Sequence, residues 1–209
     1  MAIPLPKVVA IAGGSCAGKS WLAEHLQKRL EIPSARLSLD SFYRDRAGLT
    51  PAELARVNFD DPCAIEWPLV EKALHHFLHR ERVCAPRYQF KTHSRAEQPE
   101  LIEPGEILFL EGLWVLSQES IRSLCALKIF ISAEADLCLD RRIARDIAER
   151  GRTEKEICAQ FHNTVRPMHD RFVEPQKNYA DIVLQAPISP REIEKILNRI
   201  KELSKNQNL

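Results

Sequence analysis

The sequence lacks the features that mark several broad classes of protein. Its 30 basic and 29 acidic side chains nearly cancel, so it has no net charge of the kind that nucleic-acid binding uses. The first apolar segment, residues 7–12, is too short to be a signal sequence or a membrane span. We therefore expect a cytoplasmic protein that binds neither nucleic acid nor a membrane, with any phosphate recognition confined to a local site.

The six cysteines form no recognisable metal or redox motif. No two of them are spaced as Cys-x-x-Cys, which argues against a zinc knuckle and against a dithiol redox centre. Disulfide pairing remains open, but a core of this size does not need such cross-links and the chain shows no secretory signal. The six are Cys16, Cys63, Cys84, Cys125, Cys138 and Cys158.

Short apolar runs alternate with segments of helical periodicity. The runs, which we predict as strands, are 8–12, 35–39, 107–110, 127–131 and 181–184. The apolar spacing predicts helices over about 22–30, 69–78, 134–150 and 193–200. This order predicts one α/β domain over residues 1–209, with a mostly parallel, five-stranded sheet between layers of helices.

Local signals predict an inserted flap, a capped helix and a loose tail. Between residues 83 and 104, prolines bracket two short extended segments around a polar crown at 91–98, which predicts an inserted β-hairpin flap. The helix at 134–150 has Ser132 as its predicted N-cap and Gly151 as its end signal. The polar residues 201–209 are predicted to be a fraying tail.

The clearest motif is Gly13-Gly14-Ser15-Cys16-Ala17-Gly18-Lys19-Ser20, which fits G-x-x-x-x-G-K-[ST] between a predicted strand and a predicted helix. Its glycines let backbone N–H groups turn toward phosphates, and the helix N-terminus adds a positive dipole. Lys19 would reach the β- and γ-phosphates, and Ser20 would hold Mg²⁺. A chance match is the alternative, but the flanking elements favour a three-layer P-loop NTPase fold.

Two carboxylates are placed to act beside this P-loop. Glu111 closes the apolar run at 107–110, where a magnesium partner is expected, although a helix cap or an ion pair is an alternative role. Asp40 ends the second predicted strand, and parallel sheets bind ligands beyond the carboxyl ends of their strands. It could take the proton of an attacking hydroxyl and help to hold the metal, or it could form a turn before Ser41.

Arginines are concentrated in a predicted lid region at residues 139–165. Such a cluster, with a possible hinge at Gly151, fits an Arg-rich lid that closes on phosphates. A solvated helix face with pairs such as Arg142–Asp146 is the alternative. The arginines are Arg141, Arg142, Arg145, Arg150 and Arg152.

The histidines divide into two groups. His75, His76 and His79 fall within one helical turn, but no further ligands of suitable spacing accompany them, so we expect surface residues. His93 lies on the predicted flap with Tyr88 and Phe90, whose aromatic faces could sandwich a planar ring together with the imidazole.

Taken together, the ordered motifs resemble those of the uridine/cytidine kinase family, within a wider group of P-loop kinases that includes phosphoribulokinase and pantothenate kinase. The resemblance extends from about residue 8 to residue 184. Besides the P-loop and Glu111-Gly112, the matching segments are Asp40-Ser41-Phe42-Tyr43, Asn58-Phe59-Asp60-Asp61-Pro62, Pro86-Arg87-Tyr88-Gln89-Phe90, His93-Ser94-Arg95, Arg145-Asp146-Ile147, Glu149-Arg150-Gly151-Arg152 and Lys177-Asn178-Tyr179-Ala180-Asp181.

The resemblance implies phosphorylation of the 5′-hydroxyl of uridine and cytidine, with ATP or GTP as donor and Mg²⁺ as cofactor. On this basis we expect Asp40 and Lys19 to carry catalysis, and Ser20 and Glu111 to hold the metal. Members of the family tend to form homotetramers, so a homo-oligomer is expected as well.

The acceptor and lid residues are likewise implied by the resemblance. Asp60 resembles the ribose-binding carboxylate, and Arg145 and Arg150 resemble lid arginines that meet the triphosphate. A carboxylate that binds a buried ribose diol would discriminate against 2′-deoxynucleosides. The remaining substrate-binding residues are Tyr43, Tyr88, Phe90, His93, Arg142, Arg152 and Gln160.

Three other functions are alternatives to this interpretation. A regulatory GTPase should carry N-K-x-D for guanine, and the sequence contains no such motif. A kinase of the same group with another acceptor, such as pantothenate or a sugar phosphate, stays open. A nucleotide-binding homologue without activity is a third alternative, against which the joint presence of Lys19, Ser20, Asp40 and Glu111 argues.

Overall fold

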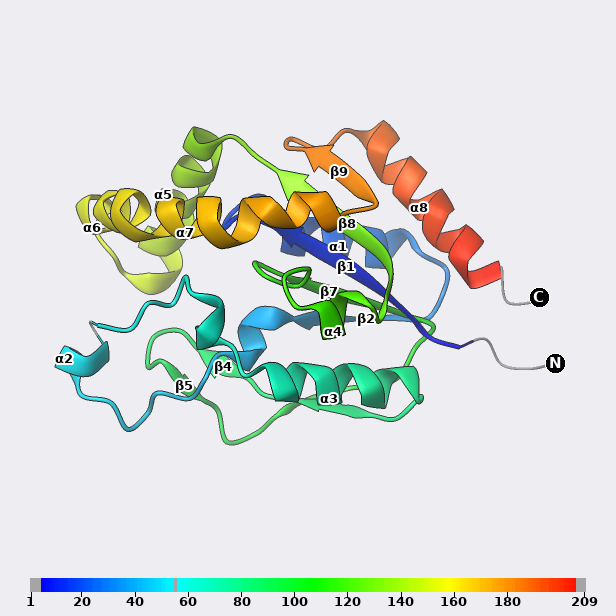
Figure 1. Cartoon of the computed structure of the whole chain (residues 1–209), viewed down its shortest axis with the longest axis horizontal. Helices are drawn as coiled ribbons and strands as arrows, with labels where there is room; N and C mark the ends of the chain where they lie inside the picture. Colours follow the sequence, from blue (N-terminus) through cyan, green and yellow to red (C-terminus); the bar gives the residue numbers. More distant parts are fainter. Residues whose placement is uncertain (1–4, 55, 206–209) are drawn as a thin grey trace.

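A computed structural model describes residues 5–54 and 56–205 and shows a parallel sheet flanked by helices (Figure 1). The five strands are β1 (Lys7–Gly13), β2 (Ser34–Ser38), β7 (Ile107–Gly112), β8 (Cys125–Ser132) and β9 (Ile182–Gln185). Their order is β2-β7-β1-β8-β9, and every neighbouring pair runs parallel. The predicted α/β fold and its five strands are therefore confirmed.

Successive side chains of β1 contribute to two different cores. Val8, Ala10 and Ala12 pack with buried residues of α3 (Trp67–Leu78), whereas Val9 and Ile11 pack with those of α1 (Lys19–Arg29) and α8 (Pro190–Lys205). All five side chains are fully buried, as expected for a central parallel strand that is covered on both faces. Figure 1 shows α1 and α8 on one face of the sheet, and α3 and α4 (Glu119–Arg122) on the other.

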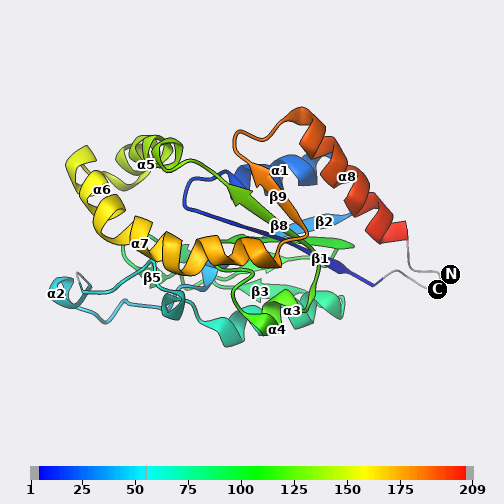
Figure 2. The ribbon, with the colours of Figure 1, turned by 45° about the horizontal axis from the view of Figure 1, so that its top comes forward.

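The flap is built from two short antiparallel pairs between α3 and β7. The outer pair joins β3 (Val83–Ala85) to β6 (Glu100–Ile102), and the inner pair joins β4 (Tyr88–Gln89) to β5 (Ser94–Arg95). The predicted inserted hairpin is thus confirmed. Figures 1 and 2 both place β5 at the same end of the sheet as α5 (Ala135–Arg150) and α6 (Glu154–Gln160), beyond the carboxyl ends of the central strands.

Two predicted helix boundaries are wrong and one is confirmed. Ser132 is not an N-cap, because it is the last residue of β8, where it pairs with Gln185, and α5 begins after Glu134 without a side-chain cap. Gly151 ends α5 with a left-handed φ of 66°, as predicted. The predicted tail is wrong over 201–205, since α8 continues to Lys205; residues 206–209 lie outside the described residues.

Two further observations concern disulfide bonds and membrane spans. All six cysteines are free thiols. Among residues 5–54 and 56–205, no helix combines the length and the apolar character that a membrane span requires.

The two remaining short helices are α2 (Pro51–Leu54) and α7 (Arg166–Met168), and α7 lies within an irregular helical segment that leads to β9.

Candidate active site

The phosphate cradle lies where β1 turns into α1. Gly13 and Gly18 have φ angles of +150° and +107°, which other residues rarely adopt. A Cβ on Gly13 would lie 2.6 Å from the carbonyl oxygen of Ile131, so only glycine fits where β1 meets β8. Lys19 begins α1, and its Nζ donates to the carbonyl oxygen of Gly14 over 2.7 Å. This bond holds the ammonium group over the loop.

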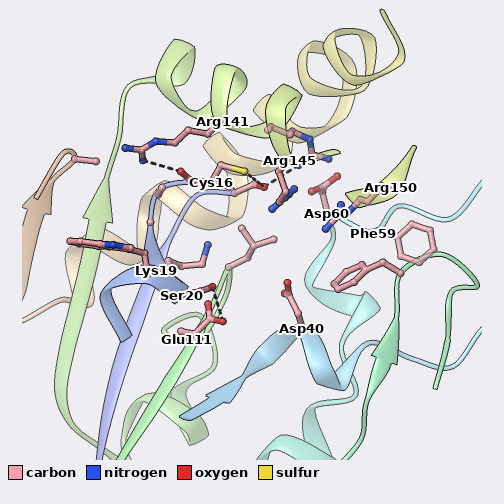
Figure 3. A pocket seen from close by; sticks show the side chains of 18 of the residues that line it. Cys16, Lys19, Ser20, Asp40, Phe59, Asp60, Glu111, Arg141, Arg145 and Arg150 are labelled. Atoms are coloured by element: carbon pink, nitrogen blue, oxygen red, sulfur yellow. Dashed lines mark hydrogen bonds between the residues drawn. The ribbon is translucent and has the colours of Figure 1, made fainter. Parts of the chain in front are cut away.

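Ser20 and Glu111 face each other beside the cradle. The Ser20 hydroxyl donates to Glu111 Oε1 over 3.1 Å, as the dashed line in Figure 3 shows. Burial raises the pKa of Glu111, and the nearby Lys19 opposes this rise. No group of three or more His, Cys, Asp or Glu side chains that could hold a metal occurs in the described part of the chain. A hydroxyl and a carboxylate fit Mg²⁺, which is commonly held by one or two carboxylates together with phosphate oxygens of a substrate.

Asp40 reaches the same space from the neighbouring strand. β2 pairs with β7 so that Ser38 lies opposite Glu111, and a 3₁₀ turn then begins at Leu39. Asp40 lies within this turn. The strand therefore ends at Ser38, two residues before Asp40, and does not continue to Leu39 as predicted. Gly112, at the end of β7, lets the turn pack closely against that strand, because a Cβ at residue 112 would lie 2.3 Å from Cβ of Leu39. Figure 3 shows the carboxylates of Asp40 and Glu111 directed into one space.

Aromatic side chains form an acceptor wall across the cavity from the cradle. The wall consists of Tyr43, Phe59, Tyr88, Phe90 and His93. Tyr43 is buried at its centre, with its ring centroid 5.1 Å from that of Tyr88 and 6.2 Å from those of Phe59 and Phe90. Its hydroxyl donates to the carbonyl oxygen of Phe59 over 3.1 Å, and burial raises its pKa well above the ordinary value.

His93 stacks on a residue of the protein itself, and not only beside Tyr88 and Phe90 as the predicted sandwich of a planar ring would have it. Its ring stacks on Phe59, with centroids 4.3 Å apart and planes inclined by 20°, so Phe59 occupies one face of the imidazole. Its Nδ1 and the hydroxyl of Tyr88 are 3.3 Å apart and share a hydrogen bond. Burial and the nearby Arg152 and Arg150 lower its pKa, which favours the neutral ring. The prediction missed this stacking because Phe59 comes from a segment far from the flap in sequence.

Asp60 lies between the acceptor wall and the lid. Burial raises its pKa, while Arg142 and Arg152 oppose that rise by favouring the charged carboxylate. In Figure 3, Asp60 lies beside Arg150 at the cavity. The guanidinium of Arg150 also lies over the ring of Phe90, 4.6 Å from its centroid. The lid and the flap are therefore in direct contact.

Four arginines of the lid, which we call the lid arginines, gather around Asp146. They are Arg142, Arg145, Arg150 and Arg152. The predicted pair of Arg142 and Asp146 is present, but the alternative of a solvated helix face is wrong for it, because Arg142 is 5% exposed and Asp146 is 0% exposed. Arg142 donates to Ser15 Oγ and to Gln160 Oε1, each over 3.0 Å, so it connects the lid to the cradle. Arg152 donates to the same Gln160 oxygen over 2.6 Å.

All but two of the predicted site residues line one cavity of about 670 Å³. The exceptions are Gly13, which packs against β8, and Gly14, whose Cβ position lies 3.1 Å from the ring of His169. The predicted residues that line the cavity are Ser15, Cys16, Ala17, Gly18, Lys19, Ser20, Asp40, Tyr43, Asp60, Tyr88, Phe90, His93, Glu111, Arg142, Arg145, Arg150, Arg152 and Gln160.

The cavity also includes residues that the predicted set of site residues did not contain. Phe59 could have been predicted from the sequence, since it precedes Asp60 within a segment that matches the family. Arg141 stood in the arginine cluster, and its Nη1 donates to the carbonyl oxygen of Cys16 over 3.2 Å. Trp21 follows the P-loop, and one of its faces stacks on His25. The others are Leu113, Ala186, Pro187 and Ile188.

Comparison with known proteins agrees with this geometry. The model of the phosphoribulokinase / uridine kinase family matches residues 8–190. The uridine kinase of Brevibacillus brevis is 37% identical over 180 residues, which cover 86% of this chain and 84% of that protein. The uridine kinase of Clostridium perfringens is 35% identical over 200 residues, which cover 95% of this chain and 96% of that protein.

Solved structures with little sequence identity share the fold. A putative fructose transport system kinase from Silicibacter superposes with a TM-score of 0.70 at 19% identity, covering 87% of this chain and 90% of that one. Phosphoribulokinase from Rhodobacter spheroides superposes with a TM-score of 0.65 at 21% identity, covering 87% of this chain and 70% of that one. Both likenesses show the three-layer arrangement of P-loop kinases.

Proposed function

The chain belongs to the phosphoribulokinase / uridine kinase family, and from this premise we propose that it transfers the γ-phosphoryl group of ATP or GTP to the 5′-hydroxyl of uridine and cytidine. The products would be UMP and CMP. The observation that carries this proposal is that one cavity contains the cradle, Asp40, the Ser20–Glu111 pair and the acceptor wall with Asp60. A triphosphate and a ribonucleoside could thus meet in it.

On the donor side, the cradle and Lys19 would bind the β- and γ-phosphates. Backbone N–H groups and the start of α1 favour negative charge here. Ser20 and Glu111 would hold Mg²⁺, which when bound neutralises charge on the phosphate oxygens. The lid residues Arg145 and Arg150 would donate charge-assisted hydrogen bonds to the transferring group.

On the acceptor side, Asp40 would accept the proton of the 5′-hydroxyl as that oxygen attacks the γ-phosphorus. It lies in the turn after β2 and lines the same cavity as the cradle and the acceptor wall, which supports this role. The bond from the γ-phosphorus to the bridging oxygen breaks, and the nucleoside diphosphate leaves. General base catalysis of this kind is worth about 10²–10⁴-fold in rate.

Recognition of the nucleoside would use Asp60 for the ribose diol and the acceptor wall for the base. A buried carboxylate that accepts two hydroxyl hydrogen bonds distinguishes ribose from 2′-deoxyribose. Arg142, Arg152 and Gln160 would close the site. A neutral His93 could donate to a pyrimidine carbonyl or, as the other tautomer, accept from an amine, which would admit both uracil and cytosine.

A phosphate-transfer panel tests the proposal. The purified chain is assayed with ATP and with GTP against uridine, cytidine, 2′-deoxycytidine, pantothenate and ribulose 5-phosphate. We expect turnover of the two ribonucleosides with either donor. Turnover of pantothenate or ribulose 5-phosphate alone would overturn the acceptor assignment, and binding of nucleotide without any turnover would favour a non-catalytic homologue.

We also propose the state in which the chain acts. Residues 1–209 would act as a single kinase domain in the cytoplasm, with the flap at 83–104 and the lid at 139–165 as parts of it. The homotetramer that the resemblance implies is tested by light scattering coupled to size-exclusion chromatography. A monomeric mass together with full activity would contradict it.

A further inference from the structure

Asp146 is the most deeply buried charged side chain among the described residues, and all four lid arginines contact it. It lies on α5 and is 0% exposed. Its carboxylate is 2.8 Å from Nε of Arg145, 3.5 Å from Nη1 of Arg150, 3.7 Å from Nε of Arg142 and 3.8 Å from Nη1 of Arg152. Each of these arginines lines the cavity, whereas Asp146 does not. Arg145 donates a hydrogen bond to this carboxylate, and the other three arginines lie at ion-pair distance from it. Asp146 therefore contacts all four lid arginines without lining the cavity itself.

The charges in this cluster do not balance. A buried carboxylate needs a partner, but one well-placed guanidinium can satisfy both of its oxygens. Four cations around one anion repel one another, and burial together with the nearby Arg145 lowers the pKa of Arg150. Burying Asp146 does not require so many arginines. Asp60 at the cavity is a second carboxylate beside Arg142, Arg150 and Arg152, yet the four lid arginines still exceed these two carboxylates by two charges. This excess is suited to a further anion that enters from the cavity.

Through Arg142, the cluster connects the two sides of the cavity. Arg142 contacts Asp146 at one end of its guanidinium and donates to Ser15 and Gln160 with its terminal nitrogens. Ser15 belongs to the cradle, while Gln160 also accepts from Arg152 on the side of Asp60. One buried carboxylate thus contacts arginines that reach the donor side and arginines that reach the acceptor side.

We propose that Asp146 is a positioning residue for the phosphoryl transfer, which fixes the lid arginines so that their remaining N–H groups face the transferring phosphate. It touches neither substrate. Arginines with one end anchored lose less freedom when they bind a phosphate, and a misplacement of about 1 Å at a reacting centre can lower the rate about 100-fold. The rate argument rests on the proposed kinase activity, but the arrangement of arginines also determines polyphosphate binding in the absence of any acceptor.

The test replaces Asp146 by asparagine, which has nearly the same shape. The backbone carbonyl of residue 146, which accepts the hydrogen bond from the N–H of Gly151 at the end of α5, is unchanged by this substitution. We expect kcat for uridine to fall about 100-fold and the affinity for inorganic tripolyphosphate, measured by calorimetry, to fall about tenfold, because the released arginines repel one another. Asp140→Asn is the matched control, since it removes the same charge from an exposed position of α5, and both values should stay within about twofold of the wild type.

The two measurements separate a positioning role from simpler ones. If Asp146 only opposed positive charge, Asp146→Asn would bind tripolyphosphate as tightly as the wild type or more tightly, and that result would overturn the proposal. Failure of the wild type to phosphorylate any nucleoside would refute the proposed function, while the tripolyphosphate comparison would still test Asp146. If Asp146→Asn does not fold, Asp146→Glu keeps the charge but moves the carboxylate. Full activity and full tripolyphosphate affinity in that variant would also overturn the proposal.

Discussion

The phosphate cradle and the acceptor wall face each other across one cavity, but they are built in different ways. The cradle is one continuous segment, residues 13–20, and its binding groups are mostly backbone N–H groups that two left-handed glycines orient. The wall collects side chains from three separate segments, with Tyr43, Phe59 and Tyr88 as its centre. The comparison teaches that donor binding should tolerate most side-chain changes in the cradle, whereas acceptor binding should depend on each side chain of the wall.

Asp40→Asn should have the largest effect, because Asp40 lies where the two regions meet and acts on the reaction itself. Asparagine keeps the shape but cannot accept the proton, so we expect kcat to fall about 10³-fold. The dissociation constants of ATP and of uridine should change less than about threefold, since neither region loses a binding group. The measurement is steady-state kinetics together with calorimetric titration. Asp45→Asn, at an exposed position, is the control. Retained activity would remove Asp40 from the role of base.

Asp60→Asn should act on the acceptor side alone. Loss of the charge weakens two hydrogen bonds to the ribose diol by about 2 kcal/mol in total, which corresponds to a rise in the KM of uridine of about 30-fold. The KM of ATP should not change. The preference for uridine over 2′-deoxyuridine, measured as a ratio of kcat/KM, should shrink in the same variant. Asp61→Asn is the neighbouring control, and an equal loss in that variant would point to a local structural effect.

Phe59→Ala should test whether the wall depends on a residue that touches no polar group of the ligand. Removal of the ring leaves His93 without its stacking partner, and such ring contacts are worth about 0.5–1.5 kcal/mol. We therefore expect the KM of uridine to rise by up to about tenfold and that of ATP to stay constant. Phe59→Leu keeps most of the apolar contact, so its KM for uridine should lie between those of the wild type and Phe59→Ala. Equal changes in the KM of both substrates would contradict the separation of the two regions.

The same difference explains which parts were predictable from the sequence. The cradle and the central strands are local patterns, so apolar runs and glycine spacing sufficed to place β1, α1 and Lys19. The stacking of Phe59 on His93 could not be predicted, because it joins segments that only the tertiary fold brings together. In the sequence, Asp146 belongs to a segment that matches the family, and its spacing from Arg142 predicts only a pair on a solvated helix face. Its complete burial depends on how α5 packs, which helical periodicity alone does not determine.

The pH dependence of acceptor binding should show that His93 acts as a neutral ring. Burial and the nearby Arg152 lower its pKa, so the imidazole is uncharged at about pH 7 and above, and gains a proton only as the pH falls through that lowered value. The KM of uridine should stay constant between about pH 7 and 8 and rise a few-fold as the pH falls through the lowered pKa of His93. His93→Gln, which cannot titrate there, should show no such rise. A rise in wild-type KM toward high pH would mean that the protonated form binds.

Cys16→Ala should have the smallest effect, although Cys16 lines the cavity within the cradle. Cys16 adopts a left-handed φ of 62°, and alanine is no more strained there than cysteine, so the loop should keep its shape. Because the backbone N–H groups are retained, we expect the KM of ATP and kcat to stay within about threefold of the wild type. Steady-state kinetics with ATP varied at saturating uridine measure both values. A tenfold loss would show that the side chain of Cys16 also contributes to donor binding, and the contrast between cradle and wall would then be one of sequence continuity and not of chemistry.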